Sequence, residues 1–462
     1  MAEGVFEHRE LMVSGALDRA ILHLGLPAAM AALFQAGFLV VDTFWLGRVG
    51  EVAIAAASTA GFVMWLAQTL GEGAAVGSGA VLAHAVGAAH HAAARRGAAA
   101  GLVLAIWGSL LVTGVGLLLA PTVFAFMRTA TPVTAAGLGY LRVILAGMPA
   151  YFLFAWIAAV FRAVGDARTP LWLLGLAGLV NVIIDPILIF GIGPVPRMET
   201  VGAALATVLS WLVAATVGWH LLGRLGVRPS FGDALHPTEE TWRALRIGLP
   251  LGLEGALFSF IYIILTRITT TFGTPAVAAL GVGHKLEVFN YFVCAGLGAA
   301  ATTLVGQNLG AGDPGRARRA GWRTLFLTVV PVGAVTLVLV SVPAAAIGLF
   351  IPAPDVIAAG VTYALLVGIS QPFMAAEVVL LGAFAGAHRT VVPAILQVVL
   401  TAARIPLAAA LVAAGWGVEG VWAAISVTTV VKGLVLAVMF AAVKLDVGNA
   451  AEIGATMTGH GR

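Results

Sequence analysis

The feature that most limits how this chain can fold is a succession of apolar blocks, each about twenty residues long or longer. A helix of about twenty residues is long enough to cross the hydrocarbon core of a bilayer. Only 10% of the 462 residues are charged, whereas a water-soluble domain carries about a quarter. The sequence therefore predicts a polytopic α-helical membrane protein, and its 57 glycines suit helices that pack closely in lipid.

The apolar blocks number twelve, in two sets of six. The first set covers residues 22–46, 53–83, 98–121, 136–160, 170–193 and 201–223, and the second covers 245–271, 276–306, 323–350, 358–385, 391–414 and 419–442. Between the sets lies a polar stretch with four arginines and three acidic residues, from Gly223 to Arg246. We therefore divide the chain into an N-terminal six-helix lobe (1–223), a linker (224–244), a C-terminal six-helix lobe (245–445) and a tail (446–462).

Arginine and lysine are distributed unevenly between the two sides of this arrangement. Seventeen of them fall in the termini and in the loops on one side, and only Arg48, Arg128 and Arg197 fall in the loops on the other side. Short loops rich in these residues remain on the cytoplasmic side of a membrane. This bias predicts that the linker and both termini are cytoplasmic.

The two sets of blocks are repeats of one another at a constant offset along the chain. Gly25-Leu-Pro matches Gly248-Leu-Pro, and the stretch from His84 matches the stretch from Gln307 at the same offset. Later matches slip slightly, so that Gly165 aligns with Gly386. Because each half has an even number of spans, both halves have the same orientation. We expect a pseudo-two-fold axis along the membrane normal, with a cavity between the lobes that suits alternating access.

Several classes of protein are excluded by what the sequence does not contain. It has no phosphate-binding loop and no soluble segment large enough for an ATPase, so an ion gradient is the expected energy source. Cys294 is the only cysteine, which excludes an internal disulfide and a cysteine-based metal cluster. The net charge of +4 comes mainly from loops, and we expect no nucleic-acid partner. The N-terminus is charged for about twenty residues and does not resemble a signal peptide.

Two aspartates stand out among the charged residues inside the spans. Asp42 and Asp185 each lie about eight residues before the outer end of their span, which places them about 10–12 Å below that surface. Asn181 lies four residues before Asp185, on the same helix face. Pro186 frees the carbonyl of Val182. These oxygens suit a small cation, and two carboxylates removed from water suit a proton carrier equally well. The pattern predicts an ion-coupling site for a proton or a sodium ion.

The remaining acids inside the spans have a weaker signature. Charged groups in a membrane usually mark a transport path, but each of these residues could instead hold helices together through hydrogen bonds. The set comprises Glu72, Glu254, Glu287 and Glu377, and Arg267, Lys285 and Arg404 are the cations that could neutralise the acids of the second lobe. His84 and Gln307 occupy equivalent positions at helix ends, where capping or gating is the favoured interpretation.

The chain resembles the multidrug and toxic compound extrusion (MATE) family over residues 20–445. The resemblance is carried by the motifs LGLPAAM from Leu24, VVDTFWLGRVG from Val40, FRAVGDARTP from Phe161, NVIIDPILIFG from Asn181, HKLEVF from His284 and VGQNLGAGDPGRARRA from Val305. It is similar to the DinF-like prokaryotic branch. That resemblance implies two six-helix bundles and secondary antiport, in which protons or sodium ions enter while amphipathic, often cationic, organic compounds leave.

The resemblance also implies which residues form the sites. Asp42, Asp185 and Asn181 would couple to the ion, and Tyr140 and Thr207 would be their polar partners in the cavity. We also place Gln35, Glu254 and Glu287 in the candidate substrate cavity; Glu254 lies one turn before the position where another branch carries an acid. In the second repeat Asp42 corresponds to Leu265, and Asp185 corresponds to about Ile405. The coupling chemistry is therefore expected to belong to the N-terminal lobe alone, with no catalytic residues, no cofactor and no resident metal besides a sodium ion at the aspartates.

These expectations describe a monomeric transporter in the inner membrane of a prokaryote, with small organic substrates and membrane lipids as its partners. One alternative is a flippase of lipids or lipid-linked saccharides, whose anionic cargo would favour more cations in the cavity than this chain has. A second alternative is a membrane-embedded enzyme, which would need a catalytic constellation that the sequence does not display.

Overall fold

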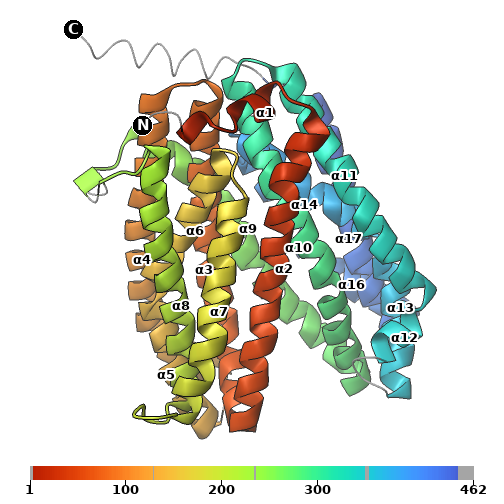
Figure 1. The fold of residues 1–462 in the computed structure, drawn as a ribbon. Coiled ribbons are helices and arrows are strands. Elements are labelled where there is room, and N and C mark those ends of the chain that lie inside the picture. The colour runs from red at the N-terminus through yellow and green to blue at the C-terminus, as the bar shows by residue number, and fades with distance from the viewer. Residues whose placement is uncertain (1–3, 128–129, 231, 234–235, 349–352, 446–462) are drawn as a thin grey trace.

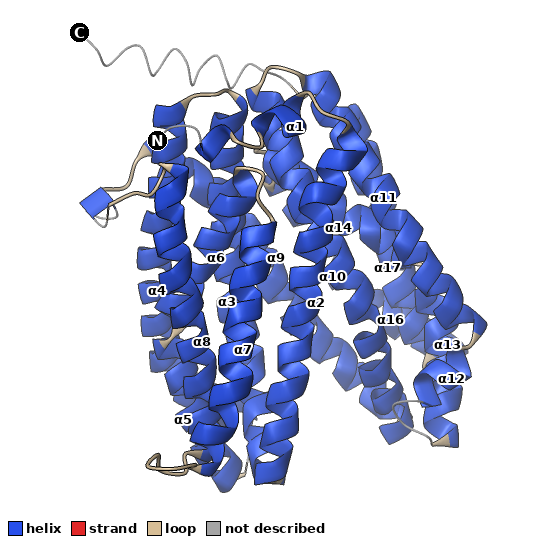
Figure 2. Cartoon of the chain, in the orientation of Figure 1, coloured by secondary structure: helices blue, strands red, loops and turns tan. Residues whose placement is uncertain are grey.

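A computed structural model describes residues 4–127, 130–230, 232–233, 236–348 and 353–445. Its described residues form helices and loops without a β-strand (Figure 2). The α-helices are α1 (Arg9–Val13), α2 (Leu17–Val49), α3 (Glu51–Gly87), α4 (His91–Met127), α5 (Thr131–Ala146), α6 (Met148–Ala163), α7 (Arg168–Phe190), α8 (Glu199–Leu222), α9 (Glu239–Thr269), α10 (Thr274–Gly310), α11 (Pro314–Ser341), α12 (Pro343–Gly348), α13 (Pro354–Gly368), α14 (Gln371–Gly386), α15 (Val391–Ala402), α16 (Arg404–Leu411) and α17 (Glu419–Ala442). Short 3-10 turns lie at Gly4–Phe6, Gly223–Leu225 and Thr270–Phe272, and a π-helical turn lies at Val412–Trp416.

The described helices account for the twelve predicted spans. Ten are long and apolar enough to cross a membrane, and two bent pairs, α5 with α6 and α13 with α14, complete the twelve. The spans predicted at 136–160 and 358–385 correspond to these two pairs, which bend by 47° and 51°. Gly147 separates the first pair, and Pro372 near the start of α14 cannot donate a backbone hydrogen bond to the turn before it. The two bends occupy equivalent places in the two repeats.

Two other predicted spans are interrupted. In the span predicted at 323–350, α11 ends at Ser341, and Pro343 starts the short helix α12; residues 349 and 350 lie outside the described residues. In the span predicted at 391–414, α15 ends at Ala402 and α16 begins at Arg404. Helix α9 begins at Glu239, inside the stretch 224–244 that we predicted as the linker. The predicted tail, 446–462, lies outside the described residues.

Each set of six spans has a hydrophobic core of its own. The largest buried cluster contains residues from Leu46 to Val227 and includes Trp156 and Phe152. A separate cluster around Trp422 and Tyr363 contains residues of the second set only. Figure 1 shows the two groups of helices close together at the end that carries α1 and spread apart toward the other end, with α2 between them. Two further clusters contain residues of both sets and mark where the lobes pack against each other.

The lobes meet through glycines that let backbones touch. A Cβ on Gly77 of α3 would lie 2.1 Å from the carbonyl oxygen of Ala244, and a Cβ on Gly248 of α9 would lie 2.1 Å from that of Gly73. On the other side of the pseudo-axis, a Cβ on Gly296 of α10 would lie 2.3 Å from the backbone nitrogen of Ala29 in α2. Even alanine would therefore force these helices apart, which gives the small residues of the sequence a structural reason.

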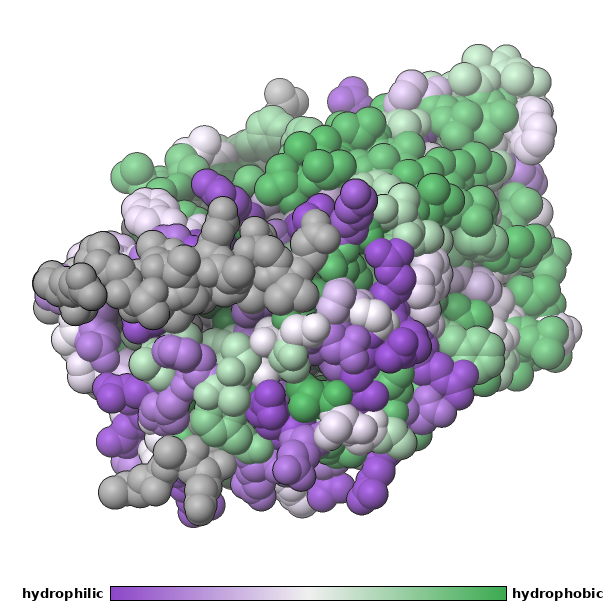
Figure 3. Space-filling view, turned by 90° about the horizontal axis from the view of Figure 1, so that it is seen from above, coloured by the Kyte–Doolittle hydropathy of each residue, from purple (hydrophilic) through white to green (hydrophobic). Residues whose placement is uncertain are grey.

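One end of the molecule, which we call the basic end, carries the beginning of α2 and the loops that follow α3, α6, α8, α10 and α14. Arginines there hold chain ends together: Arg9 donates to the carbonyl oxygen of Gly87 at 2.7 Å, and Arg318 donates to the carbonyls of Ala441 and Val443. Seen from this end, hydrophilic side chains gather on the face and apolar side chains cover the flanks (Figure 3). Exposed apolar side chains such as Leu118 and Trp172, at 78% and 77%, belong to the surface that would face lipid.

Candidate functional site

The two predicted aspartates come together inside the N-terminal lobe. Asp185 and Asn181 lie one turn apart on α7, and their residues are 0% and 4% exposed. The Asn181 side-chain nitrogen donates to Asp185 Oδ1 at 3.4 Å. Asp42 of α2 faces them, and its carboxyl interacts with the side chains of Asp185, Asn181 and Thr207. The site therefore joins three helices of one lobe, α2, α7 and α8.

Two of the predicted cavity residues complete the surroundings of the aspartates. Tyr140 of α5 is 4% exposed and interacts electrostatically with Asp42 and Asp185. Thr207 of α8 donates to the carbonyl oxygen of Ala203 at 3.1 Å, which orients its hydroxyl along its own helix beside Asp42. The sequence spacing alone could not have joined α5 and α8 to this site, since only packing brings them to α2 and α7.

The oxygen atoms of the site are not all used by the protein. Asp42 Oδ1, Asn181 Oδ1 and Asp185 Oδ2 are buried and have no hydrogen-bonding partner in the described part of the chain. Unpaired buried oxygens are costly, and carboxylate and amide oxygens are the ligands of hard cations. A proton or a sodium ion would satisfy them. The residues present therefore fit the coupling ion that the family resemblance implies.

Three other predicted cavity residues lie apart from the aspartates. Gln35 is exposed on α2, two turns before Asp42. Glu254 and Glu287 belong to α9 and α10 of the other lobe, and Glu287 accepts a hydrogen bond from Tyr363. Beside that pair is a small cavity, lined also by Asn290 and Gln371, with room for a few water molecules.

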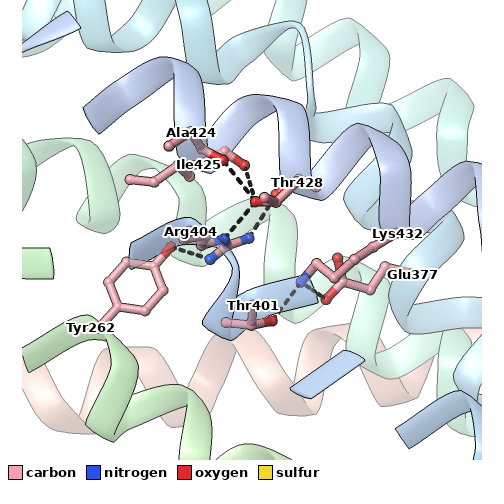
Figure 4. Close-up of polar contacts among 9 residues, drawn as sticks. Tyr262, Glu377, Thr401, Arg404, Ala424, Ile425, Thr428 and Lys432 are labelled. Atoms are coloured by element: carbon pink, nitrogen blue, oxygen red, sulfur yellow. Dashed lines mark hydrogen bonds and ion pairs between the residues drawn. The ribbon is translucent and has the colours of Figure 1, made fainter. Parts of the chain in front are cut away.

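The C-terminal lobe contains a buried polar network whose pairing the sequence reading missed. Lys432 of α17 is 0% exposed, and its ammonium group lies 2.6 Å from Glu377 Oε1 of α14 and 3.2 Å from Thr401 Oγ1. Figure 4 shows this ion pair beside Arg404. The predicted neutralising residues Arg267 and Lys285 are instead exposed. A signal for this pair was available in the sequence. One apolar block contains a lysine and another contains a glutamate, and charges buried in a membrane usually pair.

Arg404 is the second cation of this network. Its guanidinium donates to Thr428 at 2.9 Å, to Thr429 at 2.8 Å and to the Tyr262 hydroxyl at 2.8 Å (Figure 4). The Tyr262 ring also lies under the guanidinium, at 5.5 Å from its centroid. We expected Arg404 to neutralise an acid, but its direct contacts are hydroxyl groups. Long sequence separation between these partners, up to 142 residues, is why no local pattern could reveal them.

Comparison with known proteins agrees with this architecture. The MatE family model matches residues 27–187 and matches again at 250–410. The start of the second match is displaced from the start of the first by the same offset that takes Gly25 to Gly248. Among curated relatives, the chain is 28% identical over 400 residues to a probable multidrug resistance protein NorM of Thermotoga maritima, with 85% of each chain covered. It is 30% identical over 319 residues to an FAD transporter of Shewanella oneidensis, covering 68% of this chain and 70% of that protein.

The fold also matches solved structures. A MOP superfamily transporter from Pyrococcus furiosus aligns with a TM-score of 0.87 at 22% identity, covering 95% of this chain and 97% of that chain. The match supports the arrangement of the helices. Since the curated relatives are named as transporters and multidrug resistance proteins, the membrane-embedded enzyme that we considered from the sequence is not supported.

Proposed function

Because the chain belongs to the MatE family, we propose that it is a secondary antiporter, which exports organic compounds in exchange for protons or sodium ions. The observation that carries this proposal is the buried group of unpaired oxygens on Asp42, Asn181 and Asp185. A transporter that binds substrates without ion coupling would have no need for such costly groups inside a membrane.

We propose that the coupling ion and the substrate compete through this site. With the site empty, two carboxylates face each other in a medium that solvates them poorly, so the charge of an organic cation is attracted to their lobe. Binding of a proton or a sodium ion removes that attraction and satisfies the free oxygens. Asp42 lies on α2, the helix between the lobes, so a change in its pairing with α7 would alter how α2 packs and favour release of the substrate.

The driving force is sufficient for such exchange. One charge that crosses a potential of 100 mV supplies about 2.3 kcal/mol, and one pH unit adds about 1.4 kcal/mol. A single proton would thus sustain a concentration ratio of several hundredfold. We propose that the basic end, with both termini, faces the cytoplasm of a prokaryotic cell, as the arginine distribution predicts.

For the substrate we propose amphipathic organic cations, with large exposed aromatic groups such as Trp65, Phe289 and Tyr291 as the contact surface. A second candidate is an anionic aromatic compound. The FAD transporter among the relatives motivates it, together with Arg404, whose direct contacts are hydroxyls and not carboxylates. The two candidates differ in the sign of the substrate charge, which makes them easy to separate.

The test is transport by the purified chain in proteoliposomes, with a pH gradient imposed first and a sodium gradient imposed second. A cationic dye and FAD serve as the two probes. We expect one of the gradients to drive uptake of the dye, and we expect Asp42→Asn to abolish this dependence. The control is Glu199→Gln, which removes a carboxylate of the same lobe whose side chain is 54% exposed.

Each result has a clear meaning. Gradient-driven transport by the wild type and by Glu199→Gln, but not by Asp42→Asn, would support coupling at the aspartates. Transport of FAD in place of the dye would favour the second substrate class. Equal gradient-driven transport by Asp42→Asn would refute the proposed role of the site. Lack of response to both gradients with both probes would direct attention to lipid scrambling and hence to the flippase alternative.

A further inference from the structure

At the basic end the two lobes are in backbone contact. A Cβ on Gly87 at the end of α3 would lie 1.9 Å from the carbonyl oxygen of Gln307, and a Cβ on Gly310 at the end of α10 would lie 1.9 Å from that of His84. These glycines are equivalent in the two repeats. On the side of the N-terminal lobe, Arg9 donates to the carbonyl oxygen of Gly87. This crossing closes the space between the lobes at the basic end, and it would have to separate in any state that opens there.

Next to the crossing, each repeat extends one side chain toward the opposite lobe. Gln307 of α10 is 0% exposed and donates to the carbonyl oxygen of Ala163, at the end of α6, with a distance of 2.7 Å. Thr303, one turn earlier, donates to the carbonyl oxygen of Arg162 at 3.2 Å. This arm of the contact consists of neutral groups that hold their hydrogen bonds at any pH in the physiological range.

The equivalent arm on the other side of the pseudo-axis is titratable. His84 of α3, 9% exposed, lies against His388, which follows α14 of the opposite lobe; their ring centroids are 5.3 Å apart and their planes are inclined by 41°. The Nε2 atoms of both rings are buried and have no hydrogen-bonding partner in the described part of the chain. His388 also hydrogen-bonds to the backbone of Ala80, which fixes the ring at the interface. Two imidazoles therefore face each other where the equivalent arm has the amide hydrogen bond of Gln307.

The charges around this pair oppose protonation. Arg243 of α9 is the cation that acts on both rings, and it is itself paired with Glu239 at the surface. Arg9 of α1 lies at the end of α3, and α10 contributes the uncharged Gln307. Burial lowers the pKa of His388 and Arg243 lowers it further, while the hydrogen bond to Ala80 acts in the opposite direction. The closed contact thus favours the neutral form, whereas imidazoles exposed by opening would titrate near their ordinary pKa of about 6.5.

We propose that His84 and His388 form a proton-sensitive latch between the lobes, which holds the basic end closed while both rings are neutral and weakens when they are protonated. In the closed state the imidazole pKa is lower than in the open state. The closed state therefore loses stability relative to the open state as the pH falls below about 6.5. Acid should therefore favour opening, and each imidazole should shift the ratio of closed to open molecules by up to about tenfold per pH unit. This inference rests on the proposed alternating access but not on the identity of the substrate or of the coupling ion.

The test is a distance measurement between the lobes at the basic end. Spin labels at Ala92→Cys on α4 and Arg319→Cys on α11, both exposed, would report the separation by double electron–electron resonance in lipid nanodiscs. The single native cysteine, Cys294, is buried and would be replaced by alanine. All samples carry Asp42→Asn and Asp185→Asn, so that the aspartates of the other site do not titrate. The key variant is His84→Gln, which installs the residue of the equivalent arm.

We expect the distance distribution of the protein with both histidines to move toward longer distances between pH 7.5 and pH 5.5, with a change of at least about tenfold in the population ratio. His84→Gln should remain closed over the same range. His388→Gln, a second variant at the other ring, should behave likewise, and Gln307→His should make the response steeper. An unchanged response in His84→Gln and His388→Gln, or no response with both histidines present, would overturn the latch. If the wild-type protein still showed gradient-driven transport in that case, the proposed role of the aspartates would stand without the latch.

Discussion

The polar sites of the two lobes occupy equivalent places in the two repeats, but one consists of acidic side chains and the other is built around a basic side chain. Thr207 of the N-terminal lobe corresponds to Thr428 of the C-terminal lobe, at the same offset that aligns Gly165 with Gly386. Beside Thr207 are the carboxyls of Asp42 and Asp185, and beside Thr428 is the guanidinium of Arg404. Leu265 replaces Asp42, and Ile405, next to Arg404, stands close to the position of Asp185.

The difference teaches how one scaffold separates a working site from a structural one. In the N-terminal lobe three oxygen atoms have no partner in the described part of the chain, which is the basis for the proposed binding of a small cation there. In the C-terminal lobe the guanidinium of Arg404 is surrounded by three hydroxyl acceptors, and Lys432 is paired with Glu377. Groups that are already satisfied gain nothing from a ligand, whereas unsatisfied groups do. We therefore expect coupling to depend on the first lobe and rigidity to depend on the second.

The largest effect should come from breaking the ion pair of the C-terminal lobe. Lys432→Met leaves Glu377 buried without its counter-charge, and removal of one partner of a buried pair costs about 3–5 kcal/mol. Thermal unfolding in detergent should show this loss. The double variant Lys432→Met with Glu377→Gln should recover most of the stability, because no unpaired charge remains. Equal stability of the single variant and the wild type would show that the pair is not structural.

The next effect belongs to the N-terminal lobe. Asp185→Asn removes a carboxylate that could bind the coupling ion, and gradient-driven accumulation of substrate should fall by about a hundredfold, within the driving force of one proton. Unfolding temperature should change little, since asparagine has a similar shape and removes a buried charge. The matched variant Arg404→Leu should keep the response to the gradient. If Arg404→Leu lost the response and Asp185→Asn kept it, the assignment of roles to the lobes would have to be reversed.

The stability of Arg404→Leu, compared with that of Lys432→Met, shows which cation contributes more to the C-terminal lobe. The change removes three hydrogen bonds to hydroxyl groups, yet Thr428 also donates to the carbonyl oxygen of Ala424 at 2.8 Å and remains partly satisfied. We expect a loss of about 2 kcal/mol, at the lower end of what charge-assisted hydrogen bonds contribute. The loss should be smaller than for Lys432→Met in the same unfolding assay. A larger loss would mean that the guanidinium, and not the ion pair, organises the lobe.

The smallest effect should distinguish the two equivalent threonines. Thr428→Val removes one acceptor of the Arg404 guanidinium and should lower stability by about 1 kcal/mol without changing coupling. Thr207→Val should change stability less but slow gradient-driven transport by about fivefold, because the Asp42 carboxyl loses a polar neighbour. Measuring initial transport rates and unfolding temperatures of both variants completes the comparison. Identical behaviour of the two variants would remove the distinction between the lobes.

The overall architecture could be predicted from the sequence, because membrane spans and repeats are recognisable from local composition. Twelve spans and the offset between the repeats are visible without any contact, and the family model reproduces that offset. The bends at Gly147 and near Ser370 were not predicted, since the apolar character of each span continues across its break. Asn181 and Asp185 could be joined by helical periodicity, and Asp42 could be added by its depth.

The rest of the site depends on how helices pack. Glu377 was recognised as a charge inside the membrane, but 55 residues separate it from Lys432 and no local pattern in either span indicates the pairing. Arg404 was expected to meet a carboxylate, and the structure offers hydroxyls from α9 and α17 instead. A pair of charges can be inferred from the cost of burying each one, whereas a set of hydroxyl acceptors leaves no such trace in composition.

The separation of the hydrophobic cores has a consequence for how the protein is made. The largest core cluster is complete at Val227, so the first lobe can fold in the membrane before the ribosome has produced Glu239, where α9 begins. Two helices of this lobe still lack partners at that stage: Gly25 and Ala29 of α2 pack against Leu297 and Gly296 of α10, and α3 packs against α9. The helix that carries Asp42 is therefore fully seated only when the second lobe arrives. The newly synthesised first half would be a folded lobe in which α2 does not yet pack against α10.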